Sequence, residues 1–115
     1  MELRKYSRFC PQCEIIVALV SDEGRVVTGS MVDLSRSGLA FNYMSRLRPG
    51  IPKYALCGVM LKSGRKPLSD LLVCELVHDT PAAAAGSRLA VSTERCGIRF
   101  KRTLTVSAME SILSA

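Results

Sequence analysis

Short apolar runs, rich in β-branched residues, alternate with turn-forming segments along almost the whole chain. The turns include SDEG at 21–24, SRSG at 35–38 and SGRKP at 63–67. Runs of this length, broken by turns at near-regular spacing, favour β-strands. The six predicted strands occupy 14–20, 25–35, 39–44, 53–62, 68–79 and 88–102. Six strands in 115 residues predict one small antiparallel barrel, which leaves no exposed sheet edge.

Three segments depart from the simple strand pattern. Leucines in 68–79 have helical spacing, but the flanking turns and neighbouring strands favour a strand. Gly29 is expected to mark a bulge in the second strand. At the end of the chain Thr105 can cap a helix with one apolar face. We therefore expect a mainly β single domain over 1–115: a flexible arm at 1–9, a six-stranded antiparallel β-barrel at 10–102 and a C-terminal α-helix at 103–115.

Composition narrows the class of protein. Hydrophobic residues make up 48% of the chain, enough for a packed core. The net charge of +6 favours an anionic partner, but the basic residues are scattered and aromatics are only 5%, which argues against a nucleic-acid polymer. The apolar run at 15–20 is too short to insert in a membrane, and no signal peptide is recognised. The five cysteines are odd in number and irregularly spaced, which fits reduced thiols better than the disulfide framework of a secreted protein. We therefore expect a soluble, cytoplasmic protein.

Two groups of residues carry a chemical signal. Arg4 and Arg8 precede the first strand, and Asp33, Ser35 and Gly38 lie where the second strand meets the third. Guanidinium groups fork onto phosphate oxygens and onto the O6/N7 edge of guanine. A carboxylate accepts from guanine N1 and N2, a hydroxyl serves a phosphate, and a glycine lets backbone approach a ligand. Strand alternation is expected to place Asp33 and Ser35 on one face.

These residues resemble the motifs of the PilZ domain family, in which Arg-x-x-x-Arg on an arm is followed by Asp/Asn-x-Ser-x-x-Gly on the barrel. The chain reads RKYSR at 4–8 and DLSRSG at 33–38, and the likeness continues through GLAF at 38–41 and CGIRF at 96–100. The resemblance implies that the bacterial second messenger cyclic di-GMP binds to Arg4, Arg8, Asp33, Ser35 and Gly38, as one molecule or a stacked pair. Lys5 and Arg36 are possible helpers.

The expected function is therefore signal transduction: binding of cyclic di-GMP by a stand-alone PilZ-like domain, monomeric or weakly dimeric, that relays the signal to a protein effector. No catalytic group is recognised, so no enzyme activity and no cofactor are expected. Three alternatives remain. The chain could be a PilZ-like interaction module that does not bind the nucleotide, a barrel that binds nucleic acid, or a metal or redox protein.

The last alternative rests on Cys10 and Cys13, a Cys-x-x-Cys pair. Structural zinc sites use four ligands, so Cys74 and His78 would have to join the pair. A thioredoxin-like site needs a helix after the motif, and 14–20 is not helical in pattern. Thiols that are buried or half-buried, without a metal, are the default expectation.

Overall fold

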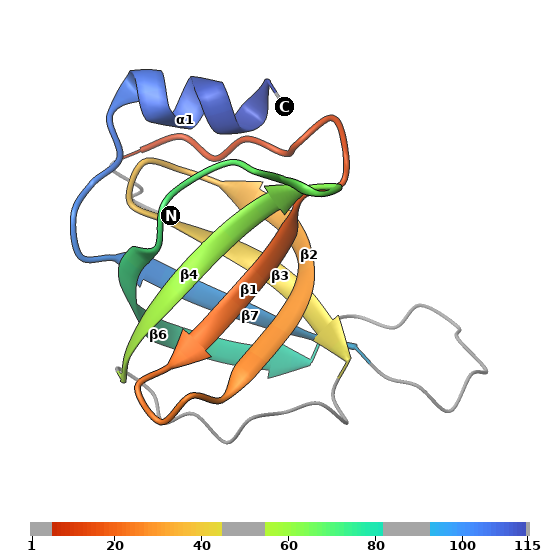
Figure 1. The fold of residues 1–115 in the computed structure, drawn as a ribbon, viewed down its shortest axis with the longest axis vertical. Helices are drawn as coiled ribbons and strands as arrows, with labels where there is room; N and C mark the ends of the chain where they lie inside the picture. The colour runs from red at the N-terminus through yellow and green to blue at the C-terminus, as the bar shows by residue number, and fades with distance from the viewer. Residues whose placement is uncertain (1–5, 45–54, 82–92, 115) are drawn as a thin grey trace, which may run out of the picture.

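The computed structural model describes residues 6–44, 55–81 and 93–114. These residues form seven strands and one helix (Figure 1). The elements are β1 (Ile16–Ser21), β2 (Val26–Leu34), β3 (Gly38–Met44), β4 (Leu56–Ser63), β5 (Lys66–Pro67), β6 (Leu72–Pro81), β7 (Thr93–Phe100) and α1 (Val106–Leu113).

The strands close into a six-stranded antiparallel barrel, as predicted. The order is β1-β2-β3-β7-β6-β4, and β4 pairs back onto β1 to complete the circle. The two-residue β5 only extends the edge of β4 through the turn at 63–66. Because every long strand has two neighbours, the barrel satisfies its ladder hydrogen bonds internally.

Alternation along the strands fills the barrel with apolar side chains. In β1, buried Val17 and Leu19 alternate with the partly exposed side chains of Ile16, Ala18 and Val20. The core also contains Phe41, Leu61 and the other buried apolar residues of the remaining strands. Each fully buried Leu, Val or Phe stabilises the fold by roughly 1.5–3 kcal/mol. The choice of a strand over a helix in 68–79 is confirmed by β6, which begins at Leu72 and ends at Pro81.

The helix α1 covers one end of the barrel, next to the N-terminal segment (Figure 1). The prediction that Thr105 caps it is confirmed, since Thr105 Oγ1 accepts from the N–H of Ala108 at 3.0 Å. Met109 and Ile112, one turn apart, are buried in the core. Among the described residues, no helix has the length and apolar content needed to cross a membrane.

The bulge in β2 is not where Gly29 predicted it. The register shifts between Met31 and Asp33, so Val32 is the extra residue. Gly29 serves close packing instead: a Cβ there would lie 2.1 Å from the backbone oxygen of Asn42. The first residues of the predicted strands at 53–62 and 88–102 lie outside the described residues.

Candidate functional site

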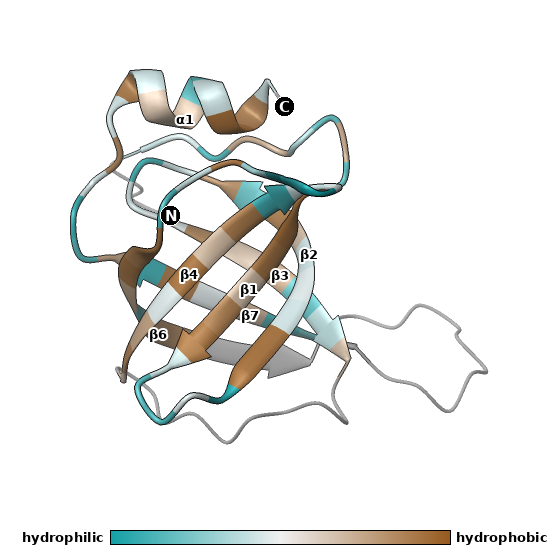
Figure 2. Ribbon diagram, in the orientation of Figure 1, coloured by the Kyte–Doolittle hydropathy of each residue, from teal (hydrophilic) through white to brown (hydrophobic). Residues whose placement is uncertain are grey.

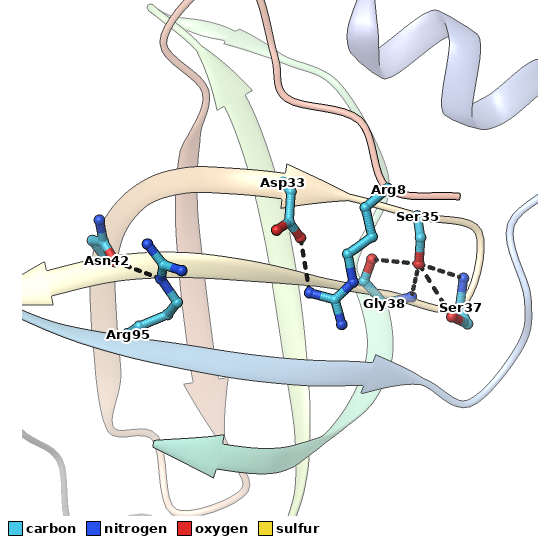
Figure 3. Close-up of polar contacts among 7 residues, drawn as sticks. All are labelled: Arg8, Asp33, Ser35, Ser37, Gly38, Asn42 and Arg95. Carbon is cyan, nitrogen blue, oxygen red and sulfur yellow. Dashed lines mark hydrogen bonds and ion pairs between the residues drawn. The ribbon is translucent and has the colours of Figure 1, made fainter. Parts of the chain in front are cut away.

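The N-terminal segment is attached to the end of β2. Phe9 and Leu34 exchange two backbone hydrogen bonds, with N···O distances of 2.8 and 2.9 Å. Next to this bridge, Arg8 Nη1 donates to Asp33 Oδ1 at 3.2 Å (Figure 3). Two of the predicted site residues, 25 positions apart, are therefore in direct contact. Arg4 lies outside the described residues.

The bulge at Val32 gives Asp33 its direction. Before the bulge, Val27 and Met31 are buried at odd-numbered positions, whereas Leu34 is buried after it. Without the extra residue, Asp33 would share the inward face of Met31. A bulge near a site commonly redirects a side chain in this way. Strict alternation thus does not set the direction of Asp33.

Ser35 lies one residue past the end of β2 and organises the turn into β3. Its Oγ accepts from the N–H groups of Ser37 and Gly38, both at 3.2 Å, and donates to the Gly38 carbonyl at 3.3 Å. Its backbone N–H also donates to that carbonyl at 2.8 Å. The Ser35 side chain is buried, so these bonds replace water as partners for the turn amides.

Gly38 begins β3 opposite Arg99 of β7. A Cβ at this position would lie 2.2 Å from the backbone oxygen of Ile98, a separation that real Cβ atoms do not show. The glycine therefore lets β3 and β7 approach each other closely. The close approach in the structure is between two strands of the protein, whereas the sequence suggested one between backbone and ligand.

A cavity of about 170 Å³ opens at this place on the barrel surface. Arg8, Ser35 and Gly38 line it together with Ser37, Val77 and Arg99. A second bulge, between Leu76 and His78, leaves Val77 without a partner on β7. Asp33 flanks the cavity through its contact with Arg8. Two larger hollows on the described surface, of about 360 and 270 Å³, are lined by other residues.

The sequence interpretation did not single out Arg99, Ser37 or Val77. Arg99 comes from β7, more than 60 positions after the motif. The alternation in ERCGIRF indicates that Arg95 and Arg99 face outward from a strand. Only the pairing of β7 with β3 shows that Arg99 lies opposite Gly38. Arg95 Nε is 3.4 Å from Asn42 Oδ1, on the same outer surface (Figure 3).

Arg8 and Arg99, two cations that line the cavity, each contact a carboxylate. Arg99 Nε donates to Glu75 Oε1 at 2.8 Å, and Lys101 Nζ lies 3.9 Å from Glu75 Oε2. The hydrogen bond from Arg99 holds the pKa of the Glu75 carboxyl below its usual range, and the charges of Arg99 and Lys101 act in the same direction. Arg36 is used structurally, because its Nε donates to the Leu104 carbonyl at 2.8 Å and its guanidinium lies 5.0 Å from the centre of the Tyr6 ring.

The cysteines differ from the default expectation. Cys10 and Cys13 are exposed, so the prediction of burial for this pair is wrong, while Cys57, Cys74 and Cys96 are buried. Desolvation raises the pKa of Cys74 to about 12. In the described part of the chain, no three His, Cys, Asp or Glu side chains gather in a way that could hold a metal ion.

Comparisons with known proteins extend this description. A family model described as the PilZ domain matches residues 2–114. A comparison with curated proteins gave no match. Among solved structures, the PilZ domain of YcgR from Escherichia coli with c-di-GMP aligns with a TM-score of 0.73 at 11% identity, covering 96% of this chain and 86% of that one.

A K. pneumoniae MrkH–c-di-GMP complex aligns with a TM-score of 0.71 at 13% identity, covering 97% of this chain and 50% of that one. YcgR from Escherichia coli in complex with c-di-GMP gives 0.65 at 12% identity, with 95% and 42% covered. The chain thus spans about half of MrkH and less than half of YcgR in that complex. At such low identity the likeness shows a shared fold.

Proposed function

Since the chain belongs to the PilZ domain family, we propose that it binds cyclic di-GMP between the N-terminal segment and the β2–β3 turn. The proposal rests mainly on one observation: Arg8 contacts Asp33 beside a cavity that Ser35 and Gly38 line. Four residues that the sequence selected by motif are thus gathered on one surface. The structures of MrkH and of YcgR that share this fold hold the same ligand.

Each residue has a chemical role in the proposal. Arg8, with Arg4, clamps phosphates or the O6/N7 edge of guanine through forked hydrogen bonds. The Asp33 carboxylate accepts from guanine N1 and N2. Ser35 and Gly38 shape the turn, and the Ser35 hydroxyl exchanges its bond to the Gly38 carbonyl for a contact to the ligand. Arg99 adds a second cation to the cavity from β7.

The size of the cavity indicates how a dinucleotide is held. Small-molecule pockets usually enclose about 300–1,000 Å³, and this cavity measures about 170 Å³. Only part of the ligand fits inside, so the remainder lies across the open surface and is covered by the arm. Ordering the arm costs about 1–2 kcal/mol for each residue fixed. Several charge-assisted hydrogen bonds are needed to offset that cost.

The ordered arm changes the surface of the domain, and we infer that a protein effector recognises the change. The role is one of binding and signal relay, with no catalytic step, in the cytoplasm. Hydrogen exchange tests the relay mechanism: the amides of residues 2–8 gain protection when cyclic di-GMP is added, whereas the Phe9 amide is already hydrogen-bonded to Leu34 in the free protein. Unchanged protection of this segment would contradict the mechanism while leaving ligand binding to be judged separately.

Calorimetry with cyclic di-GMP tests the binding itself. We expect heat from the wild type, and Arg8→Ala is expected to weaken binding by on the order of 1.5–3 kcal/mol, because a forked contact to an anion is lost. Arg65→Ala is the matched control, since Arg65 is exposed in the β4–β5 turn and makes the same change in net charge. No heat from the wild type, or equal loss in both variants, would contradict the proposal.

A further inference from the structure

The outer surface of β4 and its neighbours carries apolar side chains where solvent-facing strand positions usually carry polar ones. Exposed fractions are 52% for Leu56, 36% for Met60, 57% for Leu71 and 55% for Val73. A contiguous apolar patch on a protein surface commonly marks an interaction site. We name these four residues, with Ala18, Val20 and Gly58, the β4 face.

The strand registers make the β4 face continuous. Gly58 pairs with Val20 of β1 on one side and with Val73 of β6 on the other, and Met60 pairs with Ala18. In cross-strand pairs the side chains of one face stand next to each other. Two apolar rows therefore cross the barrel side by side, at the levels of Gly58 and Met60.

Gly58 leaves room for a neighbouring side chain on the β4 face. Leu71 lies over Gly58, because a Cβ on Gly58 would meet Leu71 Cδ1 at 2.7 Å. A hollow of about 270 Å³ lies beside Leu71 and is lined also by Val20, Leu56 and Val73. Met60, in the next row, is less exposed than Leu71 and Val73. The β4 face is thus apolar along both rows, and its most exposed side chains surround the hollow.

The ends of the β4 face carry opposite charges. Asp22 lines the hollow at the end near Leu56, in the β1–β2 turn. Lys62 is exposed at the other end of β4, paired with Ile16. Six residues of strand, about 20 Å, separate Leu56 from Lys62. Figure 2 shows this arrangement: brown segments of β1 and β4 lie between a teal β1–β2 turn and the teal end of β4.

We propose that the β4 face is the interface of a symmetric homodimer. The two-fold axis lies in the plane of the interface and crosses β4 at a right angle between Gly58 and Met60. It places the Gly58 row of one copy against the Met60 row of the other. Met60 then packs against Leu71 of the partner subunit, which lies over Gly58. Asp22 faces Lys62 of the partner subunit, and this contact occurs twice. An isologous interface requires such self-complementarity.

The second copy is favoured over another protein because one surface supplies both halves of each contact. The two apolar rows are adjacent, and Asp22 and Lys62 lie at opposite ends of the border between β1 and β4. The proposed ligand site lies elsewhere, around Arg8, Gly38 and Arg99. Dimerisation therefore does not depend on the proposed function, and either proposal can fail alone.

Charge reversal tests the interface. In Asp22→Lys or Lys62→Asp, each homodimer would contain two like-charge contacts, and we expect the dissociation constant to rise at least about tenfold in sedimentation equilibrium. An equimolar mixture of the two variants restores both opposite-charge contacts, so a heterodimer is expected to form. Glu110→Lys and Arg102→Asp, exposed charge reversals elsewhere, are the controls and should leave the wild-type dimer unchanged.

Circular dichroism establishes that each variant folds before the comparison is made. A wild-type protein that stays monomeric up to millimolar concentration would overturn the proposal. A dimer that both reversals leave intact, or a mixture that does not recover association, would also overturn it, because the interface would then involve another face.

Discussion

The guanidinium of Arg8 lies 3.2 Å from the carboxylate of Asp33, although the two residues come from the N-terminal segment and from β2. Their side chains are 35% and 18% exposed, so the ion pair is partly accessible to water. Pairs of this kind contribute about 0–1 kcal/mol to stability. In the proposed complex both groups would exchange this contact for contacts with the ligand. The ion pair therefore places the two side chains next to each other in the free protein. Breaking it costs little, so a charged ligand can take its place.

Asp33→Ala separates these two roles. The substitution removes the carboxylate and its partly accessible ion pair with Arg8, so the free energy of unfolding should change by less than about 1 kcal/mol. Binding of cyclic di-GMP should weaken by on the order of 1–3 kcal/mol, because the guanine N–H groups lose their acceptor. Urea unfolding and calorimetry on one preparation measure both. A large loss of stability with unchanged affinity would contradict this assignment.

Gly38→Ala tests the close approach of β3 and β7. The added Cβ would overlap the Ile98 carbonyl, and the strands must move apart to admit it. Overpacking of this kind typically costs 1–3 kcal/mol, so the midpoint of denaturant unfolding should fall even without ligand. Gly24→Ala separates the two kinds of cost, because a Cβ at Gly24 meets nothing within 4 Å and any loss of stability there comes from the positive φ of +84° alone. Equal stability of Gly38→Ala and wild type would show that the glycine is not needed for strand packing.

Ser35→Ala should destabilise the turn between β2 and β3. Two backbone N–H groups lose their hydroxyl acceptor inside a partly buried turn, and unsatisfied groups of this kind cost about 1–3 kcal/mol. Ser37→Ala is the control, because it removes one contact with Ser35 Oγ and leaves both amide bonds in place. Thermal unfolding should therefore show a larger shift for Ser35→Ala. The reverse order would contradict the account of the turn.

The cysteines should fall into two kinetic classes with a thiol reagent such as 5,5′-dithiobis(2-nitrobenzoate). Cys10 and Cys13 are exposed and should react rapidly, whereas Cys57, Cys74 and Cys96 should react only on unfolding. Burial raises the pKa of Cys57 and raises that of Cys74 to about 12, which removes the reactive thiolate at neutral pH. Cys10→Ser/Cys13→Ser should abolish the fast phase. A fast phase of five thiols in the native protein would show that the barrel interior is open.

The sequence predicted the barrel and the helix because their signals are local. Strand alternation, turn residues and the cap at Thr105 each depend on neighbours within a few positions. The bulge at Val32 was missed because no residue type specifies it, and Gly29 was a misleading signal. Its physical cause is the need to bury Leu34 while Asp33 faces outward.

The candidate site was predictable only in part, for a related reason. Arg8, Asp33, Ser35 and Gly38 were found through motifs that lie close together in the chain. Arg99 lies on β7, which pairs with β3, and Val77 lies on β6, which pairs with β7. Both pairings join residues that are well separated in the chain. Non-local pairing of this kind cannot be read from periodicity alone. The steric role of Gly38 likewise needed the position of Ile98.

The most direct test of the central claim is a titration of ¹⁵N-labelled protein with cyclic di-GMP, followed by amide chemical shifts. The account predicts that the amides of Arg8, Phe9 and Gly38 shift together and saturate, that Gly64 in the β4–β5 turn does not move, and that the same concentration of GMP has a much smaller effect. Shifts absent throughout, or confined to the β4 face while Arg8 and Gly38 stay unchanged, would contradict it.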